Sequence, residues 1–246
     1  KRDFQGRDGE AKSVWSGDVA DPTGKCRCSI WSEPPFDFES TPVVVRLKGV
    51  RVRAWQGIPD ITVDNESQIE VLAAAPWGDD VDLTNNVVDV ELSDLSSGAS
   101  RVGISTTGNV ISIREDSGII KRCPECRRVL RDGECATHGA QEGETDVRLR
   151  VVLDDGKSTI SLIINKSASE SLIGMKQDKI SSHIVENGTM AFVQELRDLL
   201  LGKKLKASGR TIVDEQGAML LSDDVELVEV DSVLAAAELR AKWGVV

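Results

Sequence analysis

The chain has 246 residues, 40% of them hydrophobic, and a formal net charge of −11 at pH 7. This length suits one large domain or two domains of ordinary size. The sequence contains no run of about 18 apolar residues, which excludes the usual membrane-spanning helix. The negative charge is opposite to that of a typical nucleic-acid-binding domain. Because salt screens charges beyond about 10 Å, a local basic surface can still act independently of distant acids.

The first residues include neither Met nor a signal-type apolar segment, so we expect a fragment that begins inside a longer chain. The chain has five cysteines, and three of them have the spacing of metal ligands. This usage indicates a reducing compartment rather than a disulfide framework.

The first domain is expected at residues 1–76, which are rich in short strand-like segments. Residues 12–31 predict a strand, a turn at "DPTGK" and a second strand. Three prolines exclude regular structure from the loop at 32–42. Residues 43–55 and 57–72 add further short strands. Short strands at such close spacing predict a small closed β barrel.

The chain between the two halves is polar and acidic, and we predict a linker at residues 77–100. Its last part, residues 92–100, could also begin the next domain. The second domain is expected at residues 101–230.

The second half repeats the strand pattern and adds a helix. A strand is predicted at 109–116 and a hairpin at 146–165. Helical spacing of apolar residues follows at 189–203, and two more strands lie within 204–230. Three strands, a helix and two strands is the order of a five-stranded oligonucleotide-binding (OB) barrel. The cysteine segment at 119–140 lies between the first two strands and is therefore predicted to be an insertion.

Both predicted helices have candidate N-caps. Asn187 or Thr189 can cap the internal helix, and Asp231 or Ser232 can cap a C-terminal helix at 231–246. The predicted fold class is thus mainly β, with two tandem OB barrels, a metal-binding insertion in the second, and a terminal helix.

The insertion carries four soft metal ligands in two pairs. Cys123 and Cys126 are separated by two residues, and so are Cys135 and His138. Two such turns facing each other provide a tetrahedral Cys3His shell, which is the geometry of a structural Zn²⁺ site. The shell is closed and leaves no position for a catalytic water. An iron–sulfur cluster fits the His and the short span less well, and the remaining alternative is that the cysteines are buried as small hydrophobic residues.

Basic residues surround these ligands. Lys121, Arg122, Arg127 and Arg128 lie within or beside the insertion. They are candidates for phosphate contacts held rigid by the metal. The alternative is a charged, solvated ribbon without a partner.

An aromatic and basic face is predicted on the second strand of the first domain. Strand alternation places Lys25, Arg27 and Trp31 on one face and Cys26 and Cys28 on the other. We interpret those two cysteines as core side chains of the barrel.

The next long strand repeats the pattern. Arg51, Arg53 and Trp55 share one face. The opposite face is apolar and holds Val50, Val52 and Ala54. Both strands place indoles beside several cations and almost no acids.

This combination is typical of a surface that binds single-stranded nucleic acid. Bases stack on the indoles, at about 1–3 kcal/mol per base, while cations neutralise phosphates. Arg46 and Lys48, just before the second of these strands, are included as candidate contacts. The alternative is that both indoles belong to the core. Phe36 and Phe38 in the Pro-rich loop could cover the groove or anchor the loop.

The second barrel shows no stacking platform. Arg148 and Arg150 share a strand face and are candidate phosphate contacts, with a solvated face as the alternative. The opposite face holds Val147, Leu149 and Val151. Phe192 lies on the apolar face of the predicted helix, and His183 has no neighbour at ligand spacing.

Two segments resemble a known family. "GIIKRCPECRRVLRDGECATHG", followed by "DVRLRVVLDDG", closely resembles the zinc-ribbon OB domain of replication protein A, especially its archaeal form. "DPTGKCRCSIW" and "GVRVRAWQG" resemble the segments of another OB domain of that family that carry its stacking aromatics, here Trp31 and Trp55. The resemblance covers nearly the whole chain, and the zinc segment is its most specific part.

The resemblance implies a non-catalytic protein that binds and protects single-stranded DNA in replication, repair and recombination. It implies structural Zn²⁺ as the cofactor, and it implies other replication and repair proteins, further domains or sister subunits as partners. No membrane partner is expected, and the location is expected to be cytoplasmic, associated with the nucleoid if the source is archaeal.

Two other functions remain open from the sequence. The barrels could be an interaction scaffold of a replication or repair complex with little DNA affinity of their own. An enzyme is disfavoured because the sequence shows no open metal site and no pairing of a nucleophile with a base. Asp154 and Asp155 resemble a carboxylate pair, but their place in a hairpin predicts a turn.

Overall fold

We describe the chain from a computed structural model, which covers residues 1–6, 8–37, 42–55, 58–78, 87–96, 100–214 and 217–244. Within these ranges, the side chains of residues 55, 58, 96, 214 and 242 are not described. The chain divides into two compact units. Unit 1 comprises Lys1–Val90, Gly98–Ser105 and Arg210–Ala218, and unit 2 comprises Glu91–Ser97, Thr106–Gly209 and Met219–Val246.

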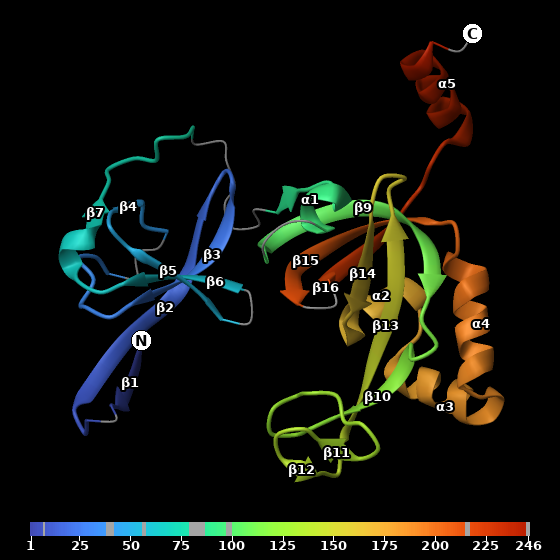
Figure 1. Cartoon of the computed structure of the whole chain (residues 1–246), viewed down its shortest axis with the longest axis horizontal. Helices are drawn as coiled ribbons and strands as arrows, with labels where there is room; N and C mark the ends of the chain where they lie inside the picture. Colours follow the sequence, from blue (N-terminus) through green and yellow to red (C-terminus); the bar gives the residue numbers. More distant parts are fainter. Residues whose placement is uncertain are drawn as a thin grey trace. The chain divides into compact units, whose positions relative to one another are not determined.

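Unit 1 is built on an antiparallel meander of three strands, β1 (Arg2–Gln5), β2 (Ala11–Asp21) and β3 (Gly24–Ile30) (Figure 1). The third strand also pairs in parallel with β6 (Ile58–Val63), which forms an antiparallel hairpin with β5 (Arg51–Trp55). A meander whose third strand lies parallel to the last strand of a following hairpin has the strand order of an OB barrel.

Local sequence explains the tight turn between β2 and β3. The Asp21 side chain accepts hydrogen bonds from the backbone N–H groups of Thr23 and Gly24, at 2.8 and 3.1 Å. Such a turn is typical of Asp, whose short side chain can bond to backbone two residues further on. The predicted turn at "DPTGK" is therefore confirmed.

A second, small sheet closes unit 1. The strands β4 (Val45–Leu47) and β7 (Ile69–Val71) pair antiparallel, and the short helix η2 (Glu66–Gln68) precedes β7. The core is a cluster of Cys28, Ile30, Val63 and Ile69, and the partly buried Trp15 and Phe36 pack against it. Cys28 is thus a core side chain, as the alternation of β3 predicts.

Unit 2 contains a second barrel, whose strands are β9 (Val102–Ile113), β13 (Glu144–Asp154), β14 (Thr159–Ile164), β15 (Lys204–Asp214) and β16 (Gly217–Val228). The order β9-β15-β16-β14-β13, with an additional pairing of β13 with β9, closes the ring. The division into units assigns the first residues of β9 and the tip of the β15–β16 hairpin to unit 1. The short β8 (Val88–Asp89) pairs in parallel with the start of β9.

The core of the second barrel is formed by the inward faces of its strands. Val147, Leu149 and Val151 of β13 are at most 1% exposed. The short helix α1 (Leu92–Ser96) contributes Leu92 and Leu95, both fully buried, and it contacts β14. The helix α1 therefore packs with unit 2, although most of the residues next to it in the sequence are polar.

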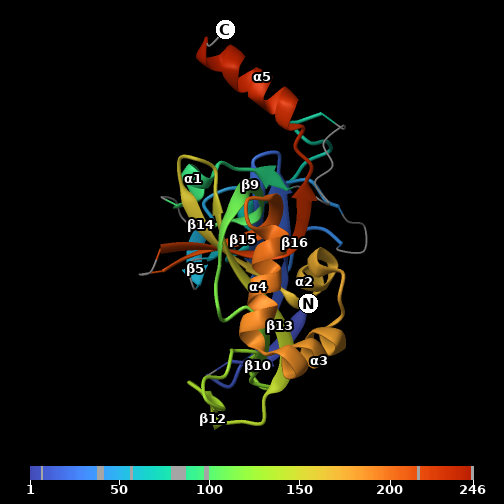
Figure 2. The same cartoon turned by 90° about the vertical axis from the view of Figure 1, so that its right-hand side faces the viewer.

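Three helices, and not the single predicted one, separate β14 from β15. They are α2 (Lys166–Ile173), α3 (Gln177–Asn187) and α4 (Thr189–Leu200) (Figure 2). The first two are short and mostly polar, so their periodicity is weak. The sequence nevertheless indicates both ends of α2. The Asn165 side chain caps its start by accepting from Ala168 N–H, and Gly174 ends it in the left-handed conformation.

The predicted internal helix is α4, and it buries Phe192, Val193, Leu196 and Leu200. The expected cap by Asn187 or Thr189 is wrong. Gly188 occupies the N-cap position with a φ of 89°, and no side chain caps the helix. The turn from α3 to α4 needs this positive φ, which favours glycine over the two polar neighbours.

The C-terminal helix α5 (Ser232–Trp243) confirms the prediction for this segment, and Asp231 caps it through the N–H groups of Val233 and Leu234. Its large apolar side chains Val233, Leu234, Leu239 and Trp243 are 51–79% exposed. Among the described residues, no helix has both the length and the apolar character needed to cross a membrane.

Candidate metal centre and nucleic-acid interface

The four predicted metal ligands lie together in the insertion that follows β10 (Gly118–Arg122), at one end of the barrel of unit 2 (Figure 1). Their ligand atoms all lie within 4.8 Å of one another. The Cys126 and Cys135 Sγ atoms are 3.5 Å apart, and His138 Nδ1 is 3.4 Å from Cys123 Sγ and 3.7 Å from Cys135 Sγ. A tetrahedral Zn²⁺ with ordinary bond lengths requires about 3.8 Å between sulfurs and about 3.5 Å between sulfur and nitrogen. The residues therefore fit this ion.

Two turns of similar form position the ligands. Arg127 and Gly139 each follow the second ligand of a pair, and both have positive φ, at 62° and 68°. In the first turn, Arg127 N–H donates to the Cys123 carbonyl at 2.9 Å, and Cys123 N–H donates to the Arg128 carbonyl at 2.8 Å. These bonds fold the backbone so that both thiols point to one side.

The surroundings of the ligands favour metal binding. A backbone hydrogen bond from Thr137 and one from His138 lower the pKa of the Cys135 thiol to about 6, so the thiolate that a metal needs is accessible near neutral pH. His138 turns Nδ1 toward the cysteines, and its Nε2 lies 3.8 Å from the Glu125 carboxylate. A carboxylate on the second ring nitrogen is the usual way to orient a metal-bound histidine.

The basic residues of the insertion have partners within the protein. Arg122 pairs with the largely buried Asp146 and donates to the Arg127 carbonyl at 3.0 Å. Arg127 pairs with Glu144. The Lys121 amine is 2.7 Å from the Thr145 hydroxyl. Residues 144–146 of β13 thus attach the metal-binding insertion to the barrel.

Arg128 donates to the Thr137 hydroxyl at 2.6 Å and so connects the two metal-binding turns. The role of these four cations in DNA binding stays a prediction, because their observed contacts are structural.

Arg148 and Arg150 also have an acidic partner. Both guanidinium groups lie 2.8 Å from Asp116 Oδ2. Burial opposes ionisation of this carboxyl, but the two arginines outweigh it and lower the pKa of Asp116. Burial lowers the pKa of Arg148, whose Nε has no hydrogen-bond partner. Arg148 is thus mostly enclosed, and Arg150 is the more accessible of the two.

The strands β3 and β5 carry cations and no acids, as expected, but neighbouring segments place acids next to these cations. Alternation along one strand cannot show which acids a neighbouring strand places opposite. The ion pairs are Lys25–Asp18 at 3.2 Å, Arg27–Asp60 at 3.5 Å, Arg46–Glu70 at 3.2 Å, Lys48–Glu70 at 2.7 Å, and Arg51–Asp64. Arg53 lies opposite Asp60 in the register of β5 and β6. Exposed pairs of this kind contribute only about 0–1 kcal/mol, so a phosphate can compete for the cations.

Trp31 lies outside the core, with 45% of its surface exposed. The backbone N–H of Trp31 donates a hydrogen bond to the Val63 carbonyl at 2.8 Å, which fixes the backbone where β3 ends. The ring is edge-to-face with Phe4, at 5.9 Å between centroids and 82° between planes. The alternative that Trp31 is a core residue is thus excluded.

The second predicted indole, Trp55, ends β5, but its side chain lies outside the described residues. The opposite face only partly forms the apolar face that we expected, because Val50 packs against the core but the other two residues do not. Val52 is 68% exposed, and Ala54 is exposed as well. In the Pro-rich loop, Phe36 packs against the core and anchors the loop, while Phe38 lies outside the described residues.

Sequence reasoning missed a hollow beside Trp31. It has a volume of about 360 Å³ and is lined by Ala11, Lys12, Ser13, Trp15, Trp31 and Glu33; we call it the indole hollow. The Lys1 amine lies 5.2 Å from the Trp15 ring, and the Arg2 guanidinium lies 5.7 Å from the Phe4 ring. In the sequence, these two cation–ring contacts are indicated only by the aromatic residues near the start of the chain. The strand β1 has four residues and is too short to show a clear periodicity.

The remaining polar clusters do not form a catalytic arrangement within the described part of the chain. Asp154 accepts from Gly156 N–H at 2.6 Å, and Asp155 accepts from Lys157 N–H at 2.9 Å, so both carboxylates hold the hairpin turn. His183 of α3 faces Glu195 of α4, with 2.9 Å between Nε2 and a carboxylate oxygen. This pair joins two helices at their exposed side.

No protein-family model matches the chain, and no curated protein matches it. Solved structures with a similar arrangement include a replication protein A heterotrimer bound to single-stranded DNA (14% identity, TM-score 0.43, 98% of this chain and 65% of that chain). They also include yeast replication protein A bound to single-stranded DNA (15%, 0.37, 56% and 85%) and a murine DNA-binding protein bound to double-stranded DNA (10%, 0.37, 93% and 92%). The chain thus covers slightly less than two thirds of the first of these. Since identities and TM-scores are low, we argue the function from this chain's own residues.

Proposed function

We propose that the chain binds and protects single-stranded DNA, without catalysing a reaction, in replication, repair and recombination. The observation that carries this proposal is the exposed Trp31 ring, which lies at the end of β3 on a small barrel and contacts Phe4. An indole that is neither buried nor free to turn is suited to stack on a base. We extend to this chain, as part of the proposal, the ligand of the replication protein A structures named above.

The charges around Trp31 are compatible with a nucleic acid despite the acidic chain. Lys25 pairs with the exposed Asp18, and the exposed Arg27 pairs with the partly buried Asp60, so each pair keeps one solvent-exposed partner and is weak. A phosphate that displaces one carboxylate gains a comparable contact and releases counterions. Binding is therefore expected to depend strongly on salt, with log K falling by about 0.7 per neutralised phosphate for each unit of log salt concentration.

The metal-binding insertion is proposed to be structural. Cys123, Cys126, Cys135 and His138 would hold a Zn²⁺ ion with four protein ligands, and such a closed shell supplies folding energy rather than Lewis-acid chemistry. Its part in the proposed function is to hold Arg127 and Arg128 in fixed positions at the end of the second barrel.

A titration of Trp fluorescence with oligothymidine of about 12 nucleotides tests the proposal. We expect quenching at low salt, and Trp31→Ala should lower the affinity by about 1–3 kcal/mol. Trp243→Ala is the matched control, because this indole is 74% exposed but lies on α5. Equal affinities of the two variants would contradict the stacking role of Trp31. The double variant Trp31→Ala, Trp55→Ala should lose about 2–6 kcal/mol if both indoles stack.

A second candidate is an interaction scaffold with little DNA affinity. It is favoured by the acids that occupy the candidate cations and by the exposed apolar side chains of α5. If the metal-bound chain binds no oligonucleotide at low salt, the interaction scaffold is favoured over the first candidate.

A further inference from the structure

The indole hollow is bounded by two strand ends and not by a flexible loop alone. Ala11, Lys12, Ser13 and Trp15 come from β2, while Trp31 and Glu33 follow the end of β3. Trp15 packs against the core of unit 1, which holds one wall of the hollow in place. Its volume of about 360 Å³ lies at the lower end of the range for small-ligand sites.

The second wall, Trp31, is supported from the first strand. The register pairs Arg2 with Val14 and Phe4 with Lys12, so these four residues share one face of the hairpin. Val14 is 3% exposed although it is not part of the core cluster, which shows that this outer face is itself covered. The edge-to-face contact of Phe4 with Trp31 then restricts the rotation of the indole.

The polar groups of the hollow have unequal freedom. Lys12 pairs with Asp8, and the Ser13 hydroxyl donates to Asp3. Among the described residues, the Glu33 carboxylate makes no hydrogen bond or ion pair, and it is exposed beside Trp31. Pro34 follows directly and biases Glu33 toward extended backbone. The hollow is therefore lined by two indole side chains and by one carboxylate without a partner among the described residues.

The charges decide which ligand suits this hollow. A carboxylate beside indoles could also receive a cationic side chain. However, Lys1 already lies over Trp15 and Arg2 lies over Phe4, so these two rings already have cationic partners. Lys1 pairs with Asp3 and Lys12 pairs with Asp8, but both pairs are exposed and weak, so a phosphate can compete for the two amines. A nucleotide has a flat base for the indoles and a phosphate for these cations, and it is therefore favoured.

We propose that the indole hollow is a subsite for one nucleobase, and that Glu33 makes it prefer a base with an exocyclic amino group. Cytosine can donate its N4 amino group to the carboxylate. Thymine has only N3–H as a donor, between two carbonyl oxygens that repel a carboxylate. This inference rests on the proposed function and adds a base preference, which stacking alone does not give.

The experiment compares oligodeoxycytidine with oligodeoxythymidine of the same length, about 12 nucleotides, by Trp quenching of the full chain at several salt concentrations. These two bases have rings of the same size, so a difference reports hydrogen bonding. We expect the wild-type chain to bind oligodeoxycytidine about 2- to 10-fold more tightly. Glu33→Gln should bring this ratio close to one, because an amide can donate to thymine as well as accept from cytosine.

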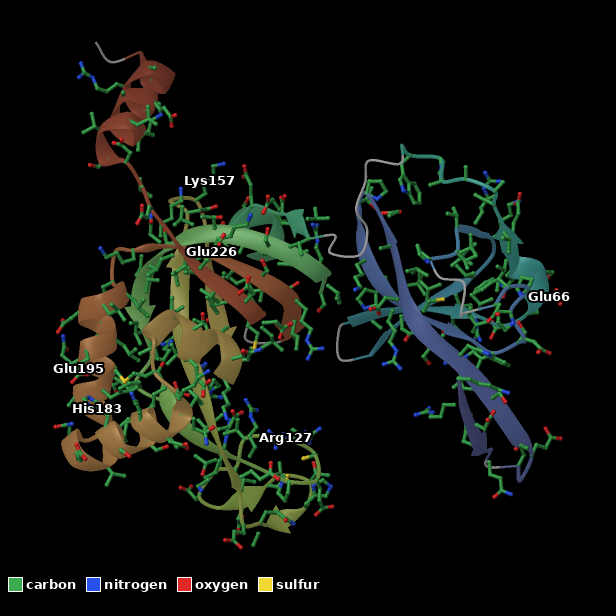
Figure 3. All side chains as sticks on the ribbon, turned by 180° about the vertical axis from the view of Figure 1, so that it is seen from behind. Glu66, Arg127, Lys157, His183, Glu195 and Glu226 are labelled. Carbon is green, nitrogen blue, oxygen red and sulfur yellow. The ribbon has the colours of Figure 1, made fainter. Side chains whose placement is uncertain are left out.

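Glu66→Gln provides the matched control. Glu66 is exposed, lies on η2 of the same unit and does not line the hollow (Figure 3). Glu66→Gln removes the same charge as Glu33→Gln, but outside the hollow, so it should leave the preference for oligodeoxycytidine unchanged. Phe4→Leu should weaken binding of both oligonucleotides by about 2- to 10-fold, because the indole loses its aromatic support.

Three results would overturn this inference, and they differ from failure of the proposed function. Equal affinity of the wild-type chain for both oligonucleotides would contradict the base preference, while single-stranded DNA binding would stand. A preference for oligodeoxycytidine that survives Glu33→Gln would show that a residue other than Glu33 causes it. Quenching by an oligolysine peptide that Glu33→Gln abolishes would identify a cation site. No binding of either oligonucleotide would instead refute the proposed function itself.

Discussion

The face of unit 1 that carries Trp31 and the metal-binding insertion of unit 2 use cations in different ways. On the strand that leads to Trp31, Lys25 and Arg27 pair with acids of neighbouring strands, and one partner of each pair is 59–61% exposed. In the insertion, Arg122 pairs with Asp146 where the side chains are only 22% and 12% exposed. Both units thus pair their cations with acids, but the pairs of unit 1 are more accessible to solvent than the Arg122–Asp146 pair.

The two regions also differ in what stabilises them. Unit 1 has an apolar cluster of Cys28, Ile30, Val63 and Ile69 below its strands. In the described insertion, the buried cluster consists of Cys123, Cys135 and Leu130, with Cys126 packed against it. Burial of one leucine side chain contributes about 1.5–3 kcal/mol, which is too little to order a segment of some twenty residues. Three of its four members are candidate metal ligands, so we infer that a bound metal would supply the remainder.

Loss of the metal is therefore expected to have the largest effect. Structural Zn²⁺ contributes about 10–16 kcal/mol in small zinc-binding peptides near pH 7. Cys135→Ser or chelation should release the ion and unfold residues 123–143, while the barrel of unit 2 keeps its strands. Metal analysis should find one zinc per chain before the change, and amide hydrogen exchange should locate the lost protection.

Cys26→Ser is the control for this prediction, because Cys26 lies on β3 outside the metal cluster. This variant should keep its metal and the protection of the insertion. Unchanged protection of residues 123–143 after complete removal of the metal would contradict the structural role and weaken the contrast between the two regions.

A smaller effect is expected when the insertion is detached from β13. Asp146→Ala leaves the largely enclosed Arg122 without its partner, and we expect a loss of about 1–3 kcal/mol in the free energy of unfolding. Glu144→Ala removes the exposed partner of Arg127 and should cost less than about 1 kcal/mol. Urea denaturation measures both values. Equal costs would show that burial does not distinguish these two pairs.

The strand order and the metal ligands could be predicted because they are local features of the sequence. Alternation and turns indicated the strands, and the spacing of Cys123, Cys126, Cys135 and His138 indicated the cluster. The partners of the cations could not be predicted in this way. Asp60 reaches Arg27 only because β6 pairs with β3, and Glu70 reaches Arg46 and Lys48 only because β7 pairs with β4.

The aromatic site shows the same limit. Trp31 was identified from one strand, but Phe4 is 27 positions earlier and meets it only when β1 adds to the meander. A strand of four residues has too little periodicity to place its side chains by pattern alone. Exposure of Val52 follows from the packing of the barrel and not from its apolar character.

The smallest effect on stability is expected for a change at Asp116. Removing this carboxylate frees two cations of unit 2 and so sharpens the comparison of the two units. The lowered pKa of Asp116 means that the ionised carboxylate stabilises the fold above about pH 4 and that this contribution is lost as the pH falls through the lowered value. Asp116→Asn should therefore cost less than about 1 kcal/mol near neutral pH, because the side chain is 49% exposed. The difference from wild type should shrink below about pH 4 in urea denaturation.

The same variant tests whether unit 2 contacts DNA. Asp116→Asn leaves Arg150 less neutralised, and if this arginine contacts a phosphate, the salt dependence should steepen by about 0.7 in log K per log salt. Glu115→Gln is the control, since its side chain is 71% exposed and its nearest cation, Arg197, is 4.0 Å away. A steeper slope for Asp116→Asn alone would make Arg150 an available contact like those of unit 1. Identical slopes for the wild-type chain and both variants would instead show that Arg148, Asp116 and Arg150 form a structural group, as Arg122 and Asp146 do.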